Sequence, residues 1–107
     1  MPILERRVQL KIKSENTYRE WEKTWEGVES RLGGFPPKRH YFLIAGSDDS
    51  GTMVWEREWE SMAVMDAAYT KMGDDPEVQR LTDGYSAVLE GERMEIYYVF
   101  GDGGVAT

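Results

Sequence analysis

The sequence predicts one α+β domain whose elements follow the order strand, helix, strand, strand, helix, strand. Apolar residues alternate with a period of two in some segments and recur every three to four residues in others. Clusters of Gly, Pro, Asp and Ser separate these segments. A length of 107 residues is typical of one domain. We expect residues 1-100 to form it and the glycine-rich residues 101-107 to be a flexible tail.

The first strand is predicted over residues 5–13, because apolar and polar side chains alternate strictly there. The apolar positions are Val8, Leu10 and Ile12, and the polar positions are Arg7, Gln9, Lys11 and Lys13. We expect Arg7, Gln9 and Lys11 to point away from the helices. Their neighbours would be Glu56, Glu58 and Glu60 on one side and Glu95 and Tyr97 on the other.

The first helix follows a capping segment at residues 14–17 and ends at Gly33-Gly34, before Pro36-Pro37. Its apolar stripe consists of Tyr18, Trp21, Trp25, Val28 and Leu32, each three or four residues after the last. We expect the opposite, exposed face to hold Arg19, Glu20, Glu22, Lys23, Glu26 and Glu29.

Two strands come next, over residues 38–46 and 52–60, and the turn residues 46–51 predict that they form a hairpin. Ser61 is a suitable N-cap for a second helix, and Asp75 with Pro76 starts a shorter one. The last strand is expected at about residues 93–100.

This order is that of the ferredoxin-like fold, a four-stranded antiparallel sheet in strand order 4-1-3-2 with both helices on one face. The opposite face receives apolar groups from the second strand in either parity, and Tyr97 and Val99 from the last strand. A contiguous apolar patch usually marks an interface, so we predict a homodimer through this sheet face.

Composition narrows the function classes. The chain has no cysteine, which excludes thiolate metal sites and thiol nucleophiles. A net charge of -7 argues against nucleic acid as a partner. No apolar run approaches the roughly 20 residues of a membrane span. We expect a cytoplasmic protein with no metal and no cofactor.

The third strand, Val54 to Ser61, contains Trp55 and Trp59 and leads directly into a helix rich in Met and Ala. A further helix begins at Asp75-Pro76, and an aromatic strand ends the domain. In this pattern residues 5–100 resemble the NIPSNAP family and the related antibiotic-biosynthesis monooxygenases of the dimeric α+β-barrel superfamily. The resemblance implies a homodimer whose two sheets form a barrel, and a pocket between sheet and helices in each subunit. Superfamily members bind ligands, oxygenate without cofactors, degrade haem or isomerise, so the fold leaves the function open.

Arg57 is the main candidate ligand-binding residue, because by parity it shares the helix-facing side of its strand with Trp55 and Trp59. It either anchors a carboxylate, phenolate or enolate, or pairs with Asp66 or a nearby Glu. The aromatic residues expected to line the same pocket are Trp55, Trp59, Trp21 and Trp25.

The candidate acids and bases are His40, Tyr69 and Asp66. His40 suits a general base or a haem ligand, or is an ordinary edge residue. Three functions remain open: a protein that binds a small apolar or aromatic molecule, a cofactor-free monooxygenase or isomerase, and a structural dimer module.

Overall fold

The computed structural model describes residues 1–100 and contains a four-stranded antiparallel sheet in the order β2-β3-β1-β4. Its elements are β1 (Ile3–Ile12), α1 (Glu15–Leu32), β2 (Arg39–Phe42), β3 (Met53–Trp59), α2 (Met62–Gly73), α3 (Pro76–Asp83), the short 3-10 helix η1 (Tyr85–Ala87) and β4 (Leu89–Tyr98). The predicted ferredoxin-like α+β fold is confirmed. The expected tail, residues 101-107, lies outside the described residues.

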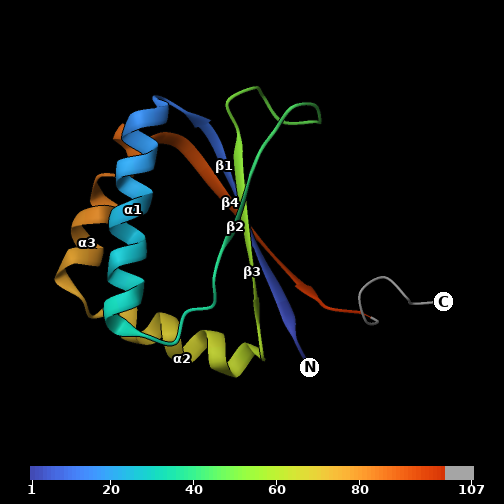
Figure 1. Cartoon of the computed structure of the whole chain (residues 1–107), viewed down its shortest axis with the longest axis vertical. Helices are drawn as coiled ribbons and strands as arrows, with labels where there is room; N and C mark the ends of the chain where they lie inside the picture. Colours follow the sequence, from blue (N-terminus) through green and yellow to red (C-terminus); the bar gives the residue numbers. More distant parts are fainter. Residues whose placement is uncertain (101–107) are drawn as a thin grey trace.

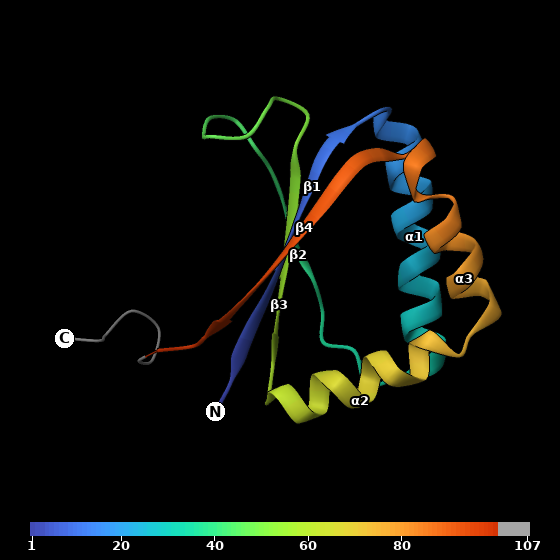
Figure 2. The ribbon, with the colours of Figure 1, turned by 180° about the vertical axis from the view of Figure 1, so that it is seen from behind.

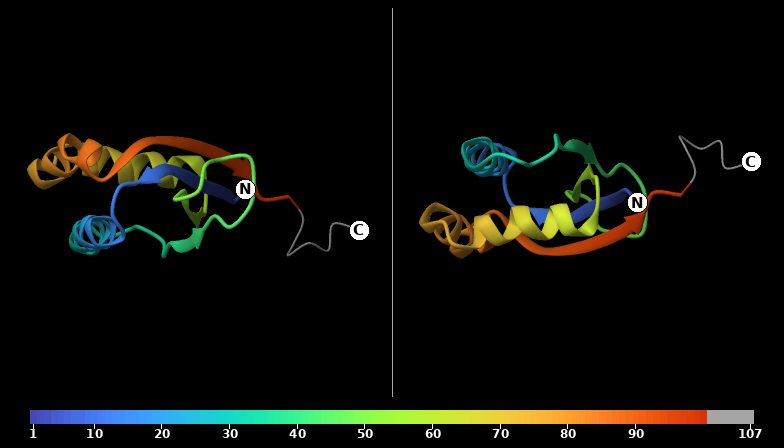
Figure 3. Two further views of the ribbon diagram at one scale, coloured as in Figure 1. Left: turned by 90° about the horizontal axis from the view of Figure 1, so that it is seen from above. Right: turned by 90° about the horizontal axis from the view of Figure 1, so that it is seen from below.

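The helices form one layer on one side of the sheet. Figures 1 and 2 show α1 and α3 side by side in this layer, while α2 crosses beneath it from the end of β3. Seen end-on, α1 lies on the side of β2, and α2 and α3 lie on the side of β4 (Figure 3). The space between these two groups of helices and the sheet is where the candidate site lies.

The predicted helix boundaries are confirmed by their caps. The hydroxyls of Ser14 and Ser61 each accept a hydrogen bond from a backbone N–H in the first turn of α1 and α2. Asp75 does the same for α3, with Pro76 in the first turn. Gly33 and Gly34 follow α1 with φ angles of 76° and 87°, a conformation that only glycine adopts readily.

Two strands differ in length from the sequence prediction. The edge strand β2 is shorter, because residues after Phe42 turn away into the β2–β3 loop. In contrast, β4 begins at Leu89, opposite Ile12, and pairs with nearly all of β1. Its first residues are mostly polar, so apolar alternation does not mark them, yet the backbone ladder with β1 extends the strand.

The faces of β1 are the reverse of those predicted. Arg7 and Gln9 point toward the helices and line the cavity described below, so they do not lie beside Glu56 and Glu58. On the outer face it is Arg6 that lies between Glu56 of β3 and Glu95 of β4, 3.9 Å from each. Alternation identified which residues share a face, but not which face the helices cover.

The core lies in three clusters along the sheet–helix layer. At the α2 end, Trp59 packs with Ile3, Met65 and Ala68. The other clusters are built around Tyr18 with Val88 and Leu89, and around Val28 with Met72 and Val78. None of the helices within residues 1–100 has the length and apolar run needed to cross a bilayer.

Candidate functional site

A cavity of about 440 Å³ lies between the sheet and the three helices. Its aromatic and apolar lining comes from Trp21, Trp25, Trp55, Tyr69, Met72, Val78 and Tyr85. Its charged and polar lining includes Arg7, Gln9, Glu22, Glu29, Lys38, Arg57 and Glu92. The cavity therefore combines broad aromatic walls with charged groups in an otherwise apolar layer.

Three tryptophans meet at this cavity from two elements. On α1, Trp21 and Trp25 stand edge to face with ring centroids 6.0 Å apart, and both are only half-buried. The indole N–H of Trp21 donates a hydrogen bond to the carbonyl oxygen of Leu81 in α3, which fixes the orientation of its ring. Trp55 of β3 lies in the opposite wall. The helical spacing of residues 21 and 25 places both rings toward the sheet.

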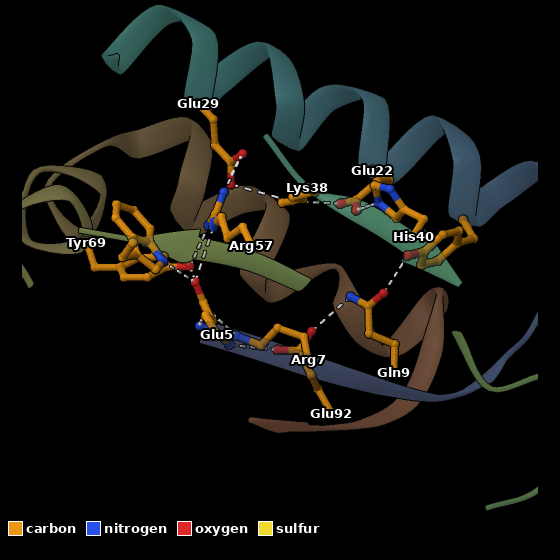
Figure 4. A network of polar contacts seen from close by, with 12 residues as sticks. Glu5, Arg7, Gln9, Glu22, Glu29, Lys38, His40, Arg57, Tyr69 and Glu92 are labelled. Carbon is orange, nitrogen blue, oxygen red and sulfur yellow. Dashed lines mark hydrogen bonds and ion pairs between the residues drawn. The ribbon is translucent and has the colours of Figure 1, made fainter. Parts of the chain in front are cut away.

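Arg57 forms the centre of a buried polar network (Figure 4), and its side chain is 1% exposed. Its Nε lies 3.2 Å from Glu5 and its Nη1 lies 2.9 Å from Glu29, so the guanidinium connects the sheet to α1. The rings of Trp55 and Trp59 lie 4.8 and 5.1 Å from its central carbon. The charge is thus paired twice and also stacked on aromatic faces.

Glu5 is the fully buried carboxylate of this network, and its contacts keep it ionised. Burial alone would raise the pKa of Glu5, but the hydrogen bond from Tyr69 and the charge of Arg7 bring that pKa below its ordinary value of 4.5. Arg7 binds it at 2.8 Å, and the indole N–H of Trp59 donates to it at 2.9 Å. A carboxylate held by so many donors has a structural role in joining β1, β3 and α2.

A second chain of ion pairs runs between α1 and the start of β2. Lys38 contacts Glu22 at 3.3 Å and Glu29 at 3.5 Å, and His40 Nε2 lies 2.6 Å from the other oxygen of Glu22. Burial raises the pKa of Glu22, but the hydrogen bond with His40 and the charge of Lys38 outweigh it and lower the pKa. These contacts, drawn in Figure 4, connect α1 to the sheet edge along one side of the cavity.

The third branch follows β1 and β4. Glu92 accepts hydrogen bonds from Arg7 at 3.0 Å and from the side-chain amide of Gln9 at 2.9 Å. The hydroxyl of Tyr18 donates to the amide oxygen of Gln9. This branch brings a carboxylate to the cavity wall on the β4 side, opposite α1.

Tyr69 supplies a hydroxyl to the cavity wall, where it donates to Glu5 and accepts from Arg57. Burial is the main cause that raises the pKa of Tyr69, and the negative charge of Glu5 adds to it, against the charge of Arg57. The phenol is therefore held in its protonated form near neutral pH, and its proton is directed at Glu5.

The structure brings together most of the residues named from the sequence, namely Trp21, Trp25, Trp55, Arg57 and Tyr69. Trp59 lies instead in the packed core, only 1% exposed. His40 is hydrogen-bonded to Glu22. Arg57 pairs with Glu5 and Glu29 and not with Asp66, which is exposed on α2.

Sequence reasoning missed the carboxylates of α1. Glu22 and Glu29 were expected on the exposed face but are both buried. The signal was present, because residue 29 follows Trp25 by four positions and residue 22 follows Tyr18 by four, which puts both on the aromatic stripe. Charge alone predicts exposure, but Lys38 and Arg57 pair with these carboxylates inside the protein.

Comparisons with known proteins identify the fold. No protein-family model matches the chain, and no curated protein sequence matches it. Within residues 1–100, no group of three or more His, Asp or Glu side chains is arranged to hold a metal ion.

Several solved structures are similar. A NIPSNAP family protein from Agrobacterium tumefaciens is 14% identical, with a TM-score of 0.70 and 100% of both chains covered. A NIPSNAP-like domain protein from Burkholderia xenovorans is 14% identical, with a TM-score of 0.67, 92% of this chain and 85% of that chain covered. SnoaB from Streptomyces nogalater, a cofactor-independent oxygenase in its N63A form, is 9% identical, with a TM-score of 0.69 and coverages of 96% and 97%. The resemblance seen in the sequence is thus confirmed as one of fold: the chain has the α+β architecture of NIPSNAP and antibiotic-biosynthesis-monooxygenase proteins.

Proposed function

We propose that this protein binds a small apolar or aromatic molecule in the cavity between its sheet and its helices. The observation that carries the proposal is the meeting of Trp21, Trp25 and Trp55 around open space, where side chains of this size ordinarily pack against one another. The volume of about 440 Å³ falls in the range of roughly 300–1,000 Å³ typical of small-molecule sites.

The buried charges support a site that exists before its ligand arrives. Arg57 and Glu29 connect β3 to α1, and Glu22 with His40 connects α1 to β2, so the two walls of the cavity are held at fixed separation. A preformed cavity binds without the entropic cost of ordering its walls.

The proposal is tested by extracting the purified protein and identifying co-purified molecules by mass spectrometry, and by titrating it with the neutral dye Nile red. We expect saturable binding with one molecule per chain. Replacing Trp25 with Ala should weaken this binding by about tenfold or more, as expected for an aromatic hot spot. The matched control is Glu26→Ala on the exposed face of α1. Equal losses in both variants, or no saturable binding, would contradict the proposal.

We further propose that two copies associate through the outer sheet face. Tyr41 and Tyr97 are 41% and 44% exposed there, on strands β2 and β4 at opposite edges of the sheet. The strand register places Val8 beside Val54 between them, but these two are already buried, so the tyrosines supply the exposed aromatic surface. A second sheet laid on this surface would cover its apolar groups from water.

Sedimentation tests the dimer. We expect about twice 12.3 kDa at micromolar concentration, and Tyr97→Asp should shift the protein toward the monomer. The control is Met62→Asp on α2, which is similarly exposed at 43% but lies on the helical side. A wild-type monomer at that concentration would contradict the proposal.

Catalysis by a cofactor-free monooxygenase or isomerase stays an alternative prediction. The similarity to a cofactor-independent oxygenase is one of fold, and it assigns no reacting group in this chain. We place binding first because the hydroxyl of Tyr69 and the ring of His40 are each hydrogen-bonded to a carboxylate within the protein. A location in the cytoplasm likewise remains a prediction from the sequence.

A further inference from the structure

The charges around the cavity are unequal in number. Three cationic side chains face it, and each contacts two carboxylates: Arg7 binds Glu5 and Glu92, Lys38 binds Glu22 and Glu29, and Arg57 binds Glu5 and Glu29. Four carboxylates therefore share three cations, which leaves one negative charge in excess when His40 is counted as neutral. No cation in this set is free to receive an anionic ligand.

The tryptophan rings that line the cavity differ in whether cationic side chains of the protein lie over them. The ring of Trp55 already has Lys38, Arg57 and Arg7 over it, at 4.4, 4.8 and 5.7 Å. Within the described part of the chain, no Lys or Arg side chain lies over the rings of Trp21 or Trp25. The negative faces of these two indoles are therefore not used by the protein's own cations.

Glu92 is the carboxylate of the four that remains most accessible. Its side chain is 28% exposed, against 0%, 8% and 9% for Glu5, Glu22 and Glu29. It shares Arg7 with Glu5, which binds the same guanidinium at the shorter distance of 2.8 Å. Glu92 is thus the most accessible carboxylate in the cavity wall, and its one cationic partner, Arg7, is shared with Glu5.

We propose that the ligand of this cavity is an organic cation: an aromatic ring that carries a protonated amine. This rests on the proposed binding function and names the class of ligand. The amine takes its charge partner from Glu92, and the faces of Trp21 and Trp25 are available to the cation and its ring. The net charge of -7 of the whole chain also favours the approach of a cation over that of an anion.

The anion-binding role considered for Arg57 from the sequence is not compatible with this arrangement. A carboxylate or phenolate in the cavity meets Glu29 and Glu92 with no unpaired cation to offset the repulsion. Freeing Arg57 for such a ligand requires breaking its contacts with two buried carboxylates.

Calorimetric titration with three probes of matched shape tests the proposal: naphthylethylamine, naphthylethanol and naphthylacetate. We expect the amine to bind about tenfold more tightly than the neutral alcohol, and the acid to bind most weakly. Glu92→Gln should remove most of the preference for the amine over the alcohol. Glu90→Gln, an exposed neighbour on β4 outside the cavity lining, is the control and should behave as wild type.

The possible failures are distinguishable. Tighter binding of the acid, equal binding of amine and alcohol, or an unchanged preference in Glu92→Gln overturns the inference about charge while the binding function stands. If none of the three probes binds the wild-type protein, the inference and the proposed function both fail. Saturable binding of the alcohol by Glu92→Gln shows that the variant has kept its fold and cavity.

Discussion

The two ends of the layer between sheet and helices are built differently, although one strand contributes a tryptophan to each. Trp59 packs against Ile3, Met65 and Ala68 beneath α2, with Phe35 at 5.7 Å from its ring. Trp55, four residues earlier on the same strand face, borders the cavity below α1. Small and flexible apolar side chains let α2 close onto the sheet at the first end.

At the other end, long charged side chains span the distance between α1 and the sheet. Glu29 reaches Arg57, and Glu22 reaches Lys38 and His40, so beside the cavity charged side chains connect α1 to the sheet. Apolar packing at one end stabilises the fold, and paired charges at the other end keep a cavity open. We therefore propose that stability and binding depend on different tryptophans of the same layer.

The largest effect on the free energy of unfolding is expected at the packed end of the layer. Trp59→Ala should lower the free energy of unfolding by about 3–5 kcal/mol, because the ring is fully buried in a packed cluster. Trp25→Ala should cost less than about 2 kcal/mol, because its half-buried ring borders open space. Urea denaturation measures both, and equal losses would show that the two ends are packed alike.

A second test concerns the buried polar network around Arg57 and Glu5. Glu5→Gln should destabilise the protein by about 3 kcal/mol, since Arg57 and Arg7 each lose one of their two carboxylates in a buried setting. Glu58→Gln, an exposed residue on the neighbouring strand, should stay within about 0.5 kcal/mol of wild type. A Glu5 variant as stable as the Glu58 variant would mean that the network contributes nothing to the fold.

How far the sequence predicted this molecule depends on the kind of pattern. Helical spacing placed Trp21 and Trp25 toward the sheet, and alternation placed Trp55 and Arg57 on the helix side of β3, both correctly. Alternation failed for β1, because it carries polar residues on the face that the helices cover. A residue such as Arg7 is partly buried there because Glu5 and Glu92 pair with its charge.

The partners of Arg57 show the limit of local patterns. Glu5 and Glu29 lie 52 and 28 residues from it along the chain, so no local spacing connects them. Only the register of β1 against β3, which sets Glu5 opposite Arg57, makes the first pair evident. The cavity itself depends on such pairs, and it therefore became visible only in three dimensions.

The dependence of stability on pH gives a smaller effect, which tests whether the paired carboxylates beside the cavity stabilise the fold. The pKa values of Glu5 and Glu22 lie below 4.5 in the folded protein, so both carboxylates bind protons more weakly than in the unfolded chain. Their contribution is fully present above about pH 4.5 and is lost as the pH falls through the folded values. Denaturation from pH 6 to pH 3 should show this loss, with a shallower decline in Glu5→Gln. Parallel declines in both proteins would contradict the assignment.

The indole N–H signals of the four tryptophans give the most direct measurement of the central claim, that the cavity binds a small molecule. Titration of ¹⁵N-labelled protein with naphthylethylamine should shift the signals of Trp21, Trp25 and Trp55, which line the cavity, while the signal of Trp59, bonded to Glu5 in the packed core, stays in place. Saturable shifts confined to those three signals are the predicted result. Four unmoved signals, or a shift of Trp59 as large as the others, would contradict the account.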